Sequence, residues 1–75
     1  MTDQQALWQQ VEAIKRRVAN KIGEKPSQEI RSTPVYQAYT AMCGEAYWAY
    51  KENELDEKLI QLLQESAEKL EANIS

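Results

Sequence analysis

Glycine and proline, the residues that most often interrupt helices, occupy only four positions of the 75-residue chain. Gly23, Pro26 and Pro34 fall close together, and Gly44 is the only one outside this stretch. On both sides of residues 23–34, apolar residues recur every three or four positions, as on one face of an α-helix. No segment shows the alternation of apolar and polar residues that is typical of a strand. The sequence therefore predicts an all-α fold, either an antiparallel helical hairpin or a small three-helix bundle, in a single domain spanning residues 1–75.

The expected helices cover residues 3–22, 34–51 and 54–72. We expect a break near residues 52–53, although one continuous helix from 34 to 72 fits the same pattern. Ser, Thr, Asp and Asn satisfy free backbone N–H groups at a helix start. The expected N-terminal caps are Thr2 with Gln5, Ser27 for a single turn in the connector, Thr33 before Pro34, and Asn53 with Asp56.

Each expected helix carries an apolar stripe, and the stripes differ in width. In the first and third helices, Val18 and Leu62 lie at the centre of the stripe and are expected in the core. The second helix is apolar around most of its circumference, so more than one neighbour must cover it. A domain of this length rarely gains more than about 3–5 kcal/mol from its own core. We therefore expect a second copy of the chain to complete the fold, as a homodimer with four or six helices.

Charge is distributed unevenly along the chain, whose net charge is −3. Residues 1–25 carry five basic and three acidic side chains, whereas residues 51–75 carry three basic and seven acidic ones. Exposed opposite charges attract each other weakly. We therefore expect the first and third helices to lie side by side, within one chain or between two.

Several kinds of chemistry lack the residues that they need. Without histidine, the usual general base and the Ser–His–Asp and Cys–His arrangements are missing. The two glycines form no phosphate-binding loop, and the acidic residues at 52–57 lack the spacing of a calcium loop. We expect no enzyme activity, no cofactor and no metal. Cys43, the single cysteine, is expected to be a buried apolar side chain, with a thiol near a dimer axis or a redox sensor as the alternatives.

The most distinctive feature is a group of tyrosine and tryptophan side chains on the second expected helix. Such side chains are frequent at interfaces because they combine a large apolar surface with one polar group. Here they also take the place of phenylalanine in the core, since the chain has none. Trp48 lies away from the middle of the apolar stripe, so we expect it to face a partner. The candidate interface residues are Trp48, Tyr36, Tyr47, Tyr50, Arg16 and Arg17.

Residues 44–48 and 53–57 are similar to part of a tetratricopeptide repeat, which has a glycine, an Ala–Tyr pair and an acidic turn before its second helix. The resemblance ends there, because the turn comes two residues late and Lys58 occupies the place of a small residue. It implies an antiparallel helix pair and assigns no family.

Two main classes of function remain, and a third, a purely structural subunit of a larger assembly, differs from the first mainly in permanence. The first is a non-enzymatic helical protein-interaction module: an adaptor, a small regulator or an inhibitor of a larger protein. The alternative is a nucleic-acid-associated regulator that uses the basic end of the first helix. We prefer the first, because Arg16 and Arg17 diverge around a helix and the chain as a whole is acidic. No apolar run is long enough to cross a membrane and residues 1–5 show no signal-peptide pattern, so we expect a cytoplasmic protein without membrane contact.

Overall fold

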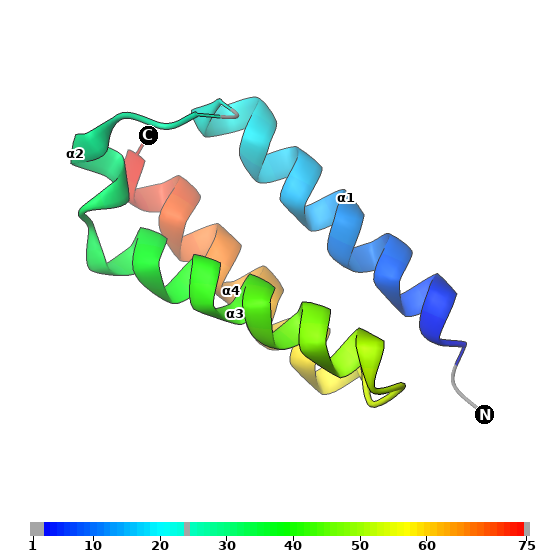
Figure 1. The fold of residues 1–75 in the computed structure, drawn as a ribbon. Helices are drawn as coiled ribbons and strands as arrows, with labels where there is room; N and C mark the ends of the chain where they lie inside the picture. Colours follow the sequence, from blue (N-terminus) through cyan, green and yellow to red (C-terminus); the bar gives the residue numbers. More distant parts are fainter. Residues whose placement is uncertain (1–2, 24, 75) are drawn as a thin grey trace.

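The computed structural model describes residues 3–23 and 25–74, and all its regular elements are helices. In chain order they are α1 (Gln4–Ile22), α2 (Gln28–Arg31), α3 (Pro34–Lys51) and α4 (Glu57–Ile74). The three long helices form an elongated bundle, in which α4 packs against both α1 and α3 (Figure 1). The helices α1 and α3 make less contact with each other. The expected all-α bundle is confirmed.

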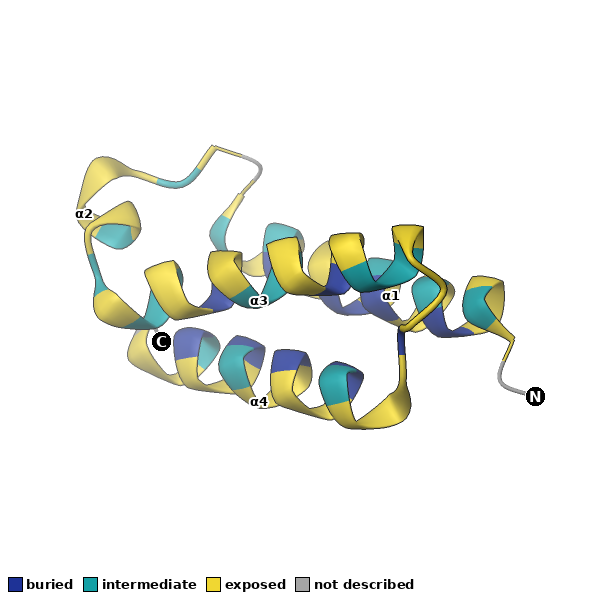
Figure 2. Cartoon of the chain, turned by 60° about the horizontal axis from the view of Figure 1, so that its bottom comes forward, coloured by how far each residue is buried: buried dark blue, intermediate teal, exposed yellow. Residues whose placement is uncertain are grey.

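The core is made by apolar side chains on the facing sides of the three long helices, and their outer sides are exposed (Figure 2). No polar or charged residue is buried in the described part of the chain. The helix α4 supplies most of the fully covered side chains, because it packs against both other long helices. The buried core residues are Leu7, Val11, Ile14, Val18, Tyr39, Ala46, Leu55, Ile60, Leu63, Ala67 and Leu70.

The first helix begins one residue later than expected. The Asp3 side chain accepts a hydrogen bond from the Gln5 backbone N–H at 3.0 Å, so Asp3 is the N-cap, whereas Thr2 lies outside the described residues. At the other end, Gly23 has a φ of 86°, and its N–H bonds to the Ala19 carbonyl at 2.8 Å. Glycine adopts this φ without steric cost, so it ends the helix and turns the chain towards the connector.

The caps expected in the connector and at the start of α3 are confirmed. The Ser27 hydroxyl accepts from the Ile30 N–H and holds the single turn of α2. The Thr33 hydroxyl accepts from the Tyr36 N–H, and Pro34 follows at the first helical position. Proline fits there because its missing N–H would have no partner within the helix.

The break between α3 and α4 is also confirmed, but its residues have different roles from those expected. Asn53 has a φ of 57° and ends α3 instead of capping α4. The Asn53 N–H bonds to the Tyr50 carbonyl at 3.1 Å and the Glu54 N–H to the Ala49 carbonyl at 2.7 Å, which is the pattern of a Schellman motif. The helix α4 therefore starts at Glu57 and not at residue 54.

Asp56 alone provides the cap of α4. Its Oδ1 atom accepts a hydrogen bond from the Leu59 N–H at 2.8 Å, three residues along the chain. Because Asn53 is used to end the previous helix, the continuous helix from 34 to 72 does not form.

The side-chain amide of Gln4 ties α1 to the turn before α4. Its Nε2 donates to the Leu55 carbonyl at 2.8 Å, and its Oε1 accepts from the Leu55 N–H at 2.9 Å. The Leu55 side chain is buried at the same point. One side chain thus satisfies both backbone groups of a residue that belongs to no helix.

The expected core position at Leu62 is wrong, whereas Val18 is buried as expected. Leu62 is 44% exposed, while Leu63 is fully covered and Ile60 is buried. The reason is that α4 is covered from two sides, by α1 and by α3. The centre of its buried face therefore lies at Leu63, and Leu62 is about 100° away around the helix.

The basic first helix and the acidic last helix do lie side by side within one chain. Arg17 Nε and Glu71 Oε1 form an ion pair of 2.9 Å between α1 and α4. Both side chains keep contact with solvent, so the pair selects the arrangement more than it stabilises it.

Candidate interaction surface

Four aromatic side chains from α1 and α3 form a continuous group, here called the aromatic cluster: Trp8, Tyr47, Trp48 and Tyr50. Trp8 stacks on Tyr50 with 4.8 Å between ring centroids and an interplanar angle of 18°. Tyr47 meets Trp8 edge-on at 6.1 Å and meets Trp48 edge-on at 5.6 Å. These are the offset and T-shaped geometries that aromatic rings prefer. The cluster links the two helices that otherwise make little contact.

Part of the aromatic cluster faces solvent. Trp48 is 65% exposed and Tyr47 is 43% exposed, whereas Trp8 and Tyr50 are half-buried. On α3, Trp48 lies opposite Tyr39 and Ala46, the two buried residues of that helix. Apart from the edge-on contact with Tyr47, most of the Trp48 side chain is open to solvent.

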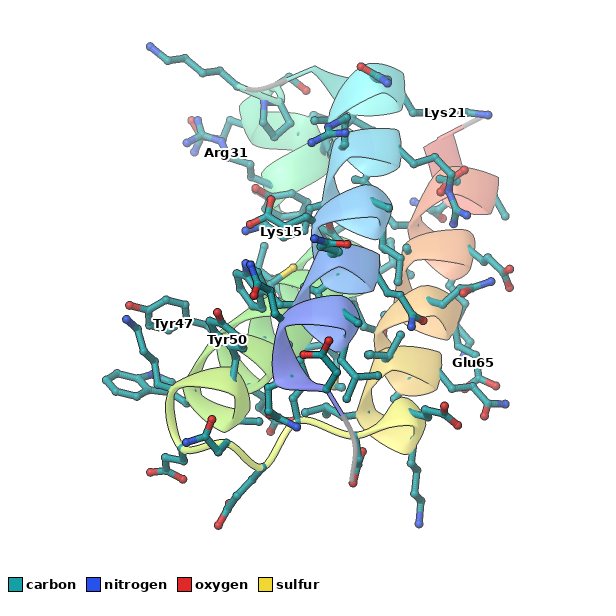
Figure 3. All side chains as sticks on the ribbon, turned by 90° about the vertical axis from the view of Figure 1, so that its right-hand side faces the viewer. Lys15, Lys21, Arg31, Tyr47, Tyr50 and Glu65 are labelled. Atoms are coloured by element: carbon teal, nitrogen blue, oxygen red, sulfur yellow. The ribbon has the colours of Figure 1, made fainter. Side chains whose placement is uncertain are left out.

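Two lysine ammonium groups lie over the rings of the aromatic cluster. Lys15 Nζ is 5.8 Å from the centroid of Trp8, and Lys51 Nζ is 5.5 Å from that of Tyr47. Both distances fit cation–π contacts. Figure 3 shows Lys15, Tyr47 and Tyr50 on one side of the bundle and Glu65 on the opposite side. The surface formed by α1 and α3 is thus aromatic and basic, and the outer side of α4 is acidic.

An apolar groove lies between α1 and α3, with a volume of about 270 Å³. Small-molecule pockets usually have about 300–1,000 Å³, so the hollow suits inserted side chains better than a cofactor. We call it the α1–α3 groove. Its lining residues are Lys15, Val18, Ala19, Ile22, Gly23, Pro26, Tyr36, Tyr39, Thr40 and Cys43.

The lining of the groove includes two titratable side chains in contact with each other. Burial raises the pKa of Tyr39 far above its usual value, and the neighbouring Cys43 raises it further. Burial also raises the pKa of the Cys43 thiol, while its hydrogen bond with Tyr39 and the charge of Lys15 act in the opposite direction. Both groups are therefore neutral at physiological pH and behave as part of an apolar surface.

We expect the Cys43 thiol to react slowly. The thiolate is the reactive form, and the raised pKa leaves less of it at pH 8 than in an unfolded chain. The rate of reaction with a disulfide reagent should be lower by about tenfold or more in the folded protein than in urea, because exposure is lost as well. Equal rates in the two states would contradict the partly buried, neutral thiol.

The structure brings together some of the candidate interface residues and separates others. Tyr47, Trp48 and Tyr50 lie in the aromatic cluster, while Tyr36 lines the α1–α3 groove. Arg16 and Arg17 are not part of either.

The two arginines occupy other sides of α1. Arg17 points towards α4 and pairs with Glu71, and Arg16 is exposed. Trp8 and Lys15 were not among the candidate interface residues, although Trp8 belongs to the aromatic cluster and Lys15 lies over its ring. The available signal was the position of Trp8 beside the apolar stripe of the first helix.

The described residues contain no group of three or more His, Cys, Asp or Glu side chains placed to hold a metal ion. In the same residues, no helix has the length and apolar character needed to cross a membrane.

Comparison with known proteins finds no relative: no family model matches the sequence, and neither a curated protein nor a solved structure shows significant similarity to the chain.

Proposed function

We propose that this chain is a non-enzymatic helical module that binds another protein through the aromatic cluster. The observation that carries the proposal is the exposure of Trp48 and Tyr47 beside a bundle whose core is filled by other residues. Tryptophan and tyrosine are the residues most enriched among those that dominate binding energy at protein interfaces. The fold does not need these two rings to be exposed at one place, whereas an interface does.

The exposed rings are also held in position before any partner arrives. Trp48 contacts Tyr47, and Tyr47 contacts both Trp8 and the Lys51 ammonium. Side chains that are already ordered lose less conformational entropy when a complex forms. This favours a binding role in which the module acts as an adaptor, a small regulator or an inhibitor of a larger protein.

No observation favours the alternative of a nucleic-acid-associated regulator. Arg17 is paired with Glu71, and Arg16 extends from a different side of α1. A nucleic-acid-binding protein usually presents its basic side chains together on one face.

Replacing Trp48 with alanine is expected to abolish the complex and preserve the fold. Truncating a central interface tryptophan typically costs about 2 kcal/mol or more, which is about 30-fold in affinity. The tagged protein and the Trp48→Ala variant would be purified from the cells that produce the chain, and stoichiometric partners identified by mass spectrometry. Circular dichroism would confirm that helix content and melting temperature are unchanged.

A matched control for this variant is Gln37→Ala, which alters an exposed position on the same helix outside the aromatic cluster. The control should retain the partner in full. Capture of the same partner by Trp48→Ala and by the original protein would contradict the proposed surface. Unfolding of the Trp48→Ala variant would assign Trp48 to the core, against its 65% exposure.

Self-association is a separate part of the proposal. Leu62 of α4 is 44% exposed and lies outside the aromatic cluster, and Ala38 and Ala41 of α3 are exposed too. We expect sedimentation at micromolar concentration to give about twice the 8.7 kDa mass of one chain. A sharp monomer mass, together with unfolding that does not depend on protein concentration, would contradict the homodimer.

A further inference from the structure

The three long helices pack unevenly against one another. The helix α4 packs against both α1 and α3, whereas α1 and α3 make less contact with each other (Figure 1). The side of α1 and α3 that α4 does not cover contains the α1–α3 groove, with the aromatic cluster along it. In a four-helix bundle, each helix lies beside two others and diagonally across from the third. The α1–α3 groove lies where a fourth helix would pack beside α1 and α3.

The helix α1 shows what chemistry suits such a neighbour. Lys15 and Arg17 are two positions apart and therefore extend from nearly opposite flanks. The Arg17 flank is covered by α4, an amphipathic helix with an acidic outer side, through the ion pair with Glu71. The Lys15 flank has an apolar groove beside it and no helix upon it.

Two lysines at the edge of the groove and of the aromatic cluster form no ion pair with the described residues. Lys15 is the one charged residue in the lining of the groove, and Lys51 lies over the aromatic cluster. Within the described residues the one ion pair is that of Arg17 and Glu71, so no carboxylate lies within 4 Å of either lysine ammonium. Glu12, the one acidic residue of α1, lies on the same flank three positions before Lys15, but it forms no ion pair with Lys15. A second copy placed symmetrically on this side would bring two positive edges together, which disfavours it as the occupant.

We propose that the α1–α3 groove binds one amphipathic helix of another protein, with its apolar stripe in the groove and its acidic side chains towards Lys15 and Lys51. This inference rests on the proposed function and specifies the chemistry of the partner. The bound helix completes a four-helix bundle. The bound helix would contact the Lys15 flank of α1 as α4 contacts the Arg17 flank, with apolar packing and an ion pair between a basic and an acidic side chain.

The test uses two sets of synthetic 18-residue amphipathic peptides. Both sets carry the same stripes of leucine, isoleucine and methionine, and one set has glutamate flanks while the other has lysine flanks. Neither contains aromatic residues, so the tryptophan emission of the protein reports binding. We expect the glutamate set to bind one peptide per chain, about tenfold or more tighter than the lysine set, with an affinity that falls as salt is added.

Reversing the charge of the groove should reverse this preference. In the Lys15→Glu, Lys51→Glu variant, the lysine-flanked peptides should bind more tightly than the glutamate-flanked ones. The matched control is Lys58→Glu, Lys69→Glu, which makes the same change of net charge at exposed positions of α4. The control should keep the original preference, because those lysines do not line the groove.

The proposal is overturned if neither peptide set binds, if both bind equally, or if the control variant changes the preference as much as the groove variant. It is also overturned if sedimentation shows a second copy displaced from the groove by the peptides. These outcomes are distinct from failure of the proposed function. If Trp48→Ala loses a cellular partner and the Lys15→Glu, Lys51→Glu variant keeps it, the chain binds that protein through the aromatic cluster. The proposed function then holds, and the proposed role of the α1–α3 groove is wrong.

Discussion

Replacing Leu63 with alanine is expected to lower the free energy of unfolding by about 2–5 kcal/mol. Leu63 is completely buried at the centre of α4, the helix that packs against both of its long neighbours. Removing its side chain leaves a cavity that α1 and α3 cannot both move to fill. A chain of 75 residues has a total stability of roughly 4–11 kcal/mol, so this loss is a large part of it. Urea unfolding followed by circular dichroism at 222 nm measures the change.

The adjacent residue provides the control. Leu62 has the same side chain on the same helix but is 44% exposed, so Leu62→Ala should cost less than about 1 kcal/mol when unfolding is measured at a concentration at which the chain is monomeric. Leu63→Asp should unfold the protein, because it buries an unpaired charge, whereas Leu62→Asp should stay folded. Equal losses at the two positions would show that the register of α4 differs from the one described.

Replacing Gln4 with alanine is expected to cost about 1–3 kcal/mol of stability. The Gln4 amide is the partner of both the N–H and the carbonyl of Leu55, at 2.9 and 2.8 Å. Without it, two backbone groups in a partly buried turn lose their partners, and the N-terminus of α1 is released from the turn before α4. Denaturant unfolding would measure the loss, and hydrogen exchange at the Leu55 amide would locate it.

A suitable control is Gln5→Ala, one residue away in the same turn of α1. Gln5 is exposed, and no side-chain hydrogen bond of its amide is found in the described residues, so its loss should change stability by less than about 0.5 kcal/mol. Fast exchange of the Leu55 amide should occur in Gln4→Ala alone. Slow exchange in that variant would mean that another group satisfies the Leu55 backbone.

The local signals in the sequence predict the helices well. Ser27 and Thr33 cap α2 and α3 as expected, and Gly23 ends α1. Each of these capping signals depends on hydrogen bonds between residues only a few positions apart. They can therefore be recognised without knowing how the helices pack. Asn53 shows the limit of this reasoning, since asparagine serves both as an N-cap and as a left-handed residue at a helix end. The hydrogen bonds of Tyr50 and Ala49 with residues 53 and 54 selected the second role.

The candidate surface could be predicted only in part. The position of Trp48 away from the apolar stripe of α3 follows from helical periodicity alone. That no helix of the same chain covers most of its ring, which is 65% exposed, is seen only in the structure. The contribution of Trp8 could not be predicted, because it depends on α1 lying beside α3 at a distance that lets the ring stack on Tyr50. Residues 42 positions apart meet only through the tertiary fold.

The sequence by itself determined the all-α class, the approximate helices, the place of Trp48 away from the apolar stripe of its helix, and the attraction between the basic first helix and the acidic last one. Periodicity, caps and charge are properties of short segments, which is why they could be read without a structure. Only the tertiary structure decided that α4 lies between α1 and α3, and therefore that Leu63 and not Leu62 is at the centre of the core. The same packing left a groove between α1 and α3, because these two helices contact each other less than either contacts α4.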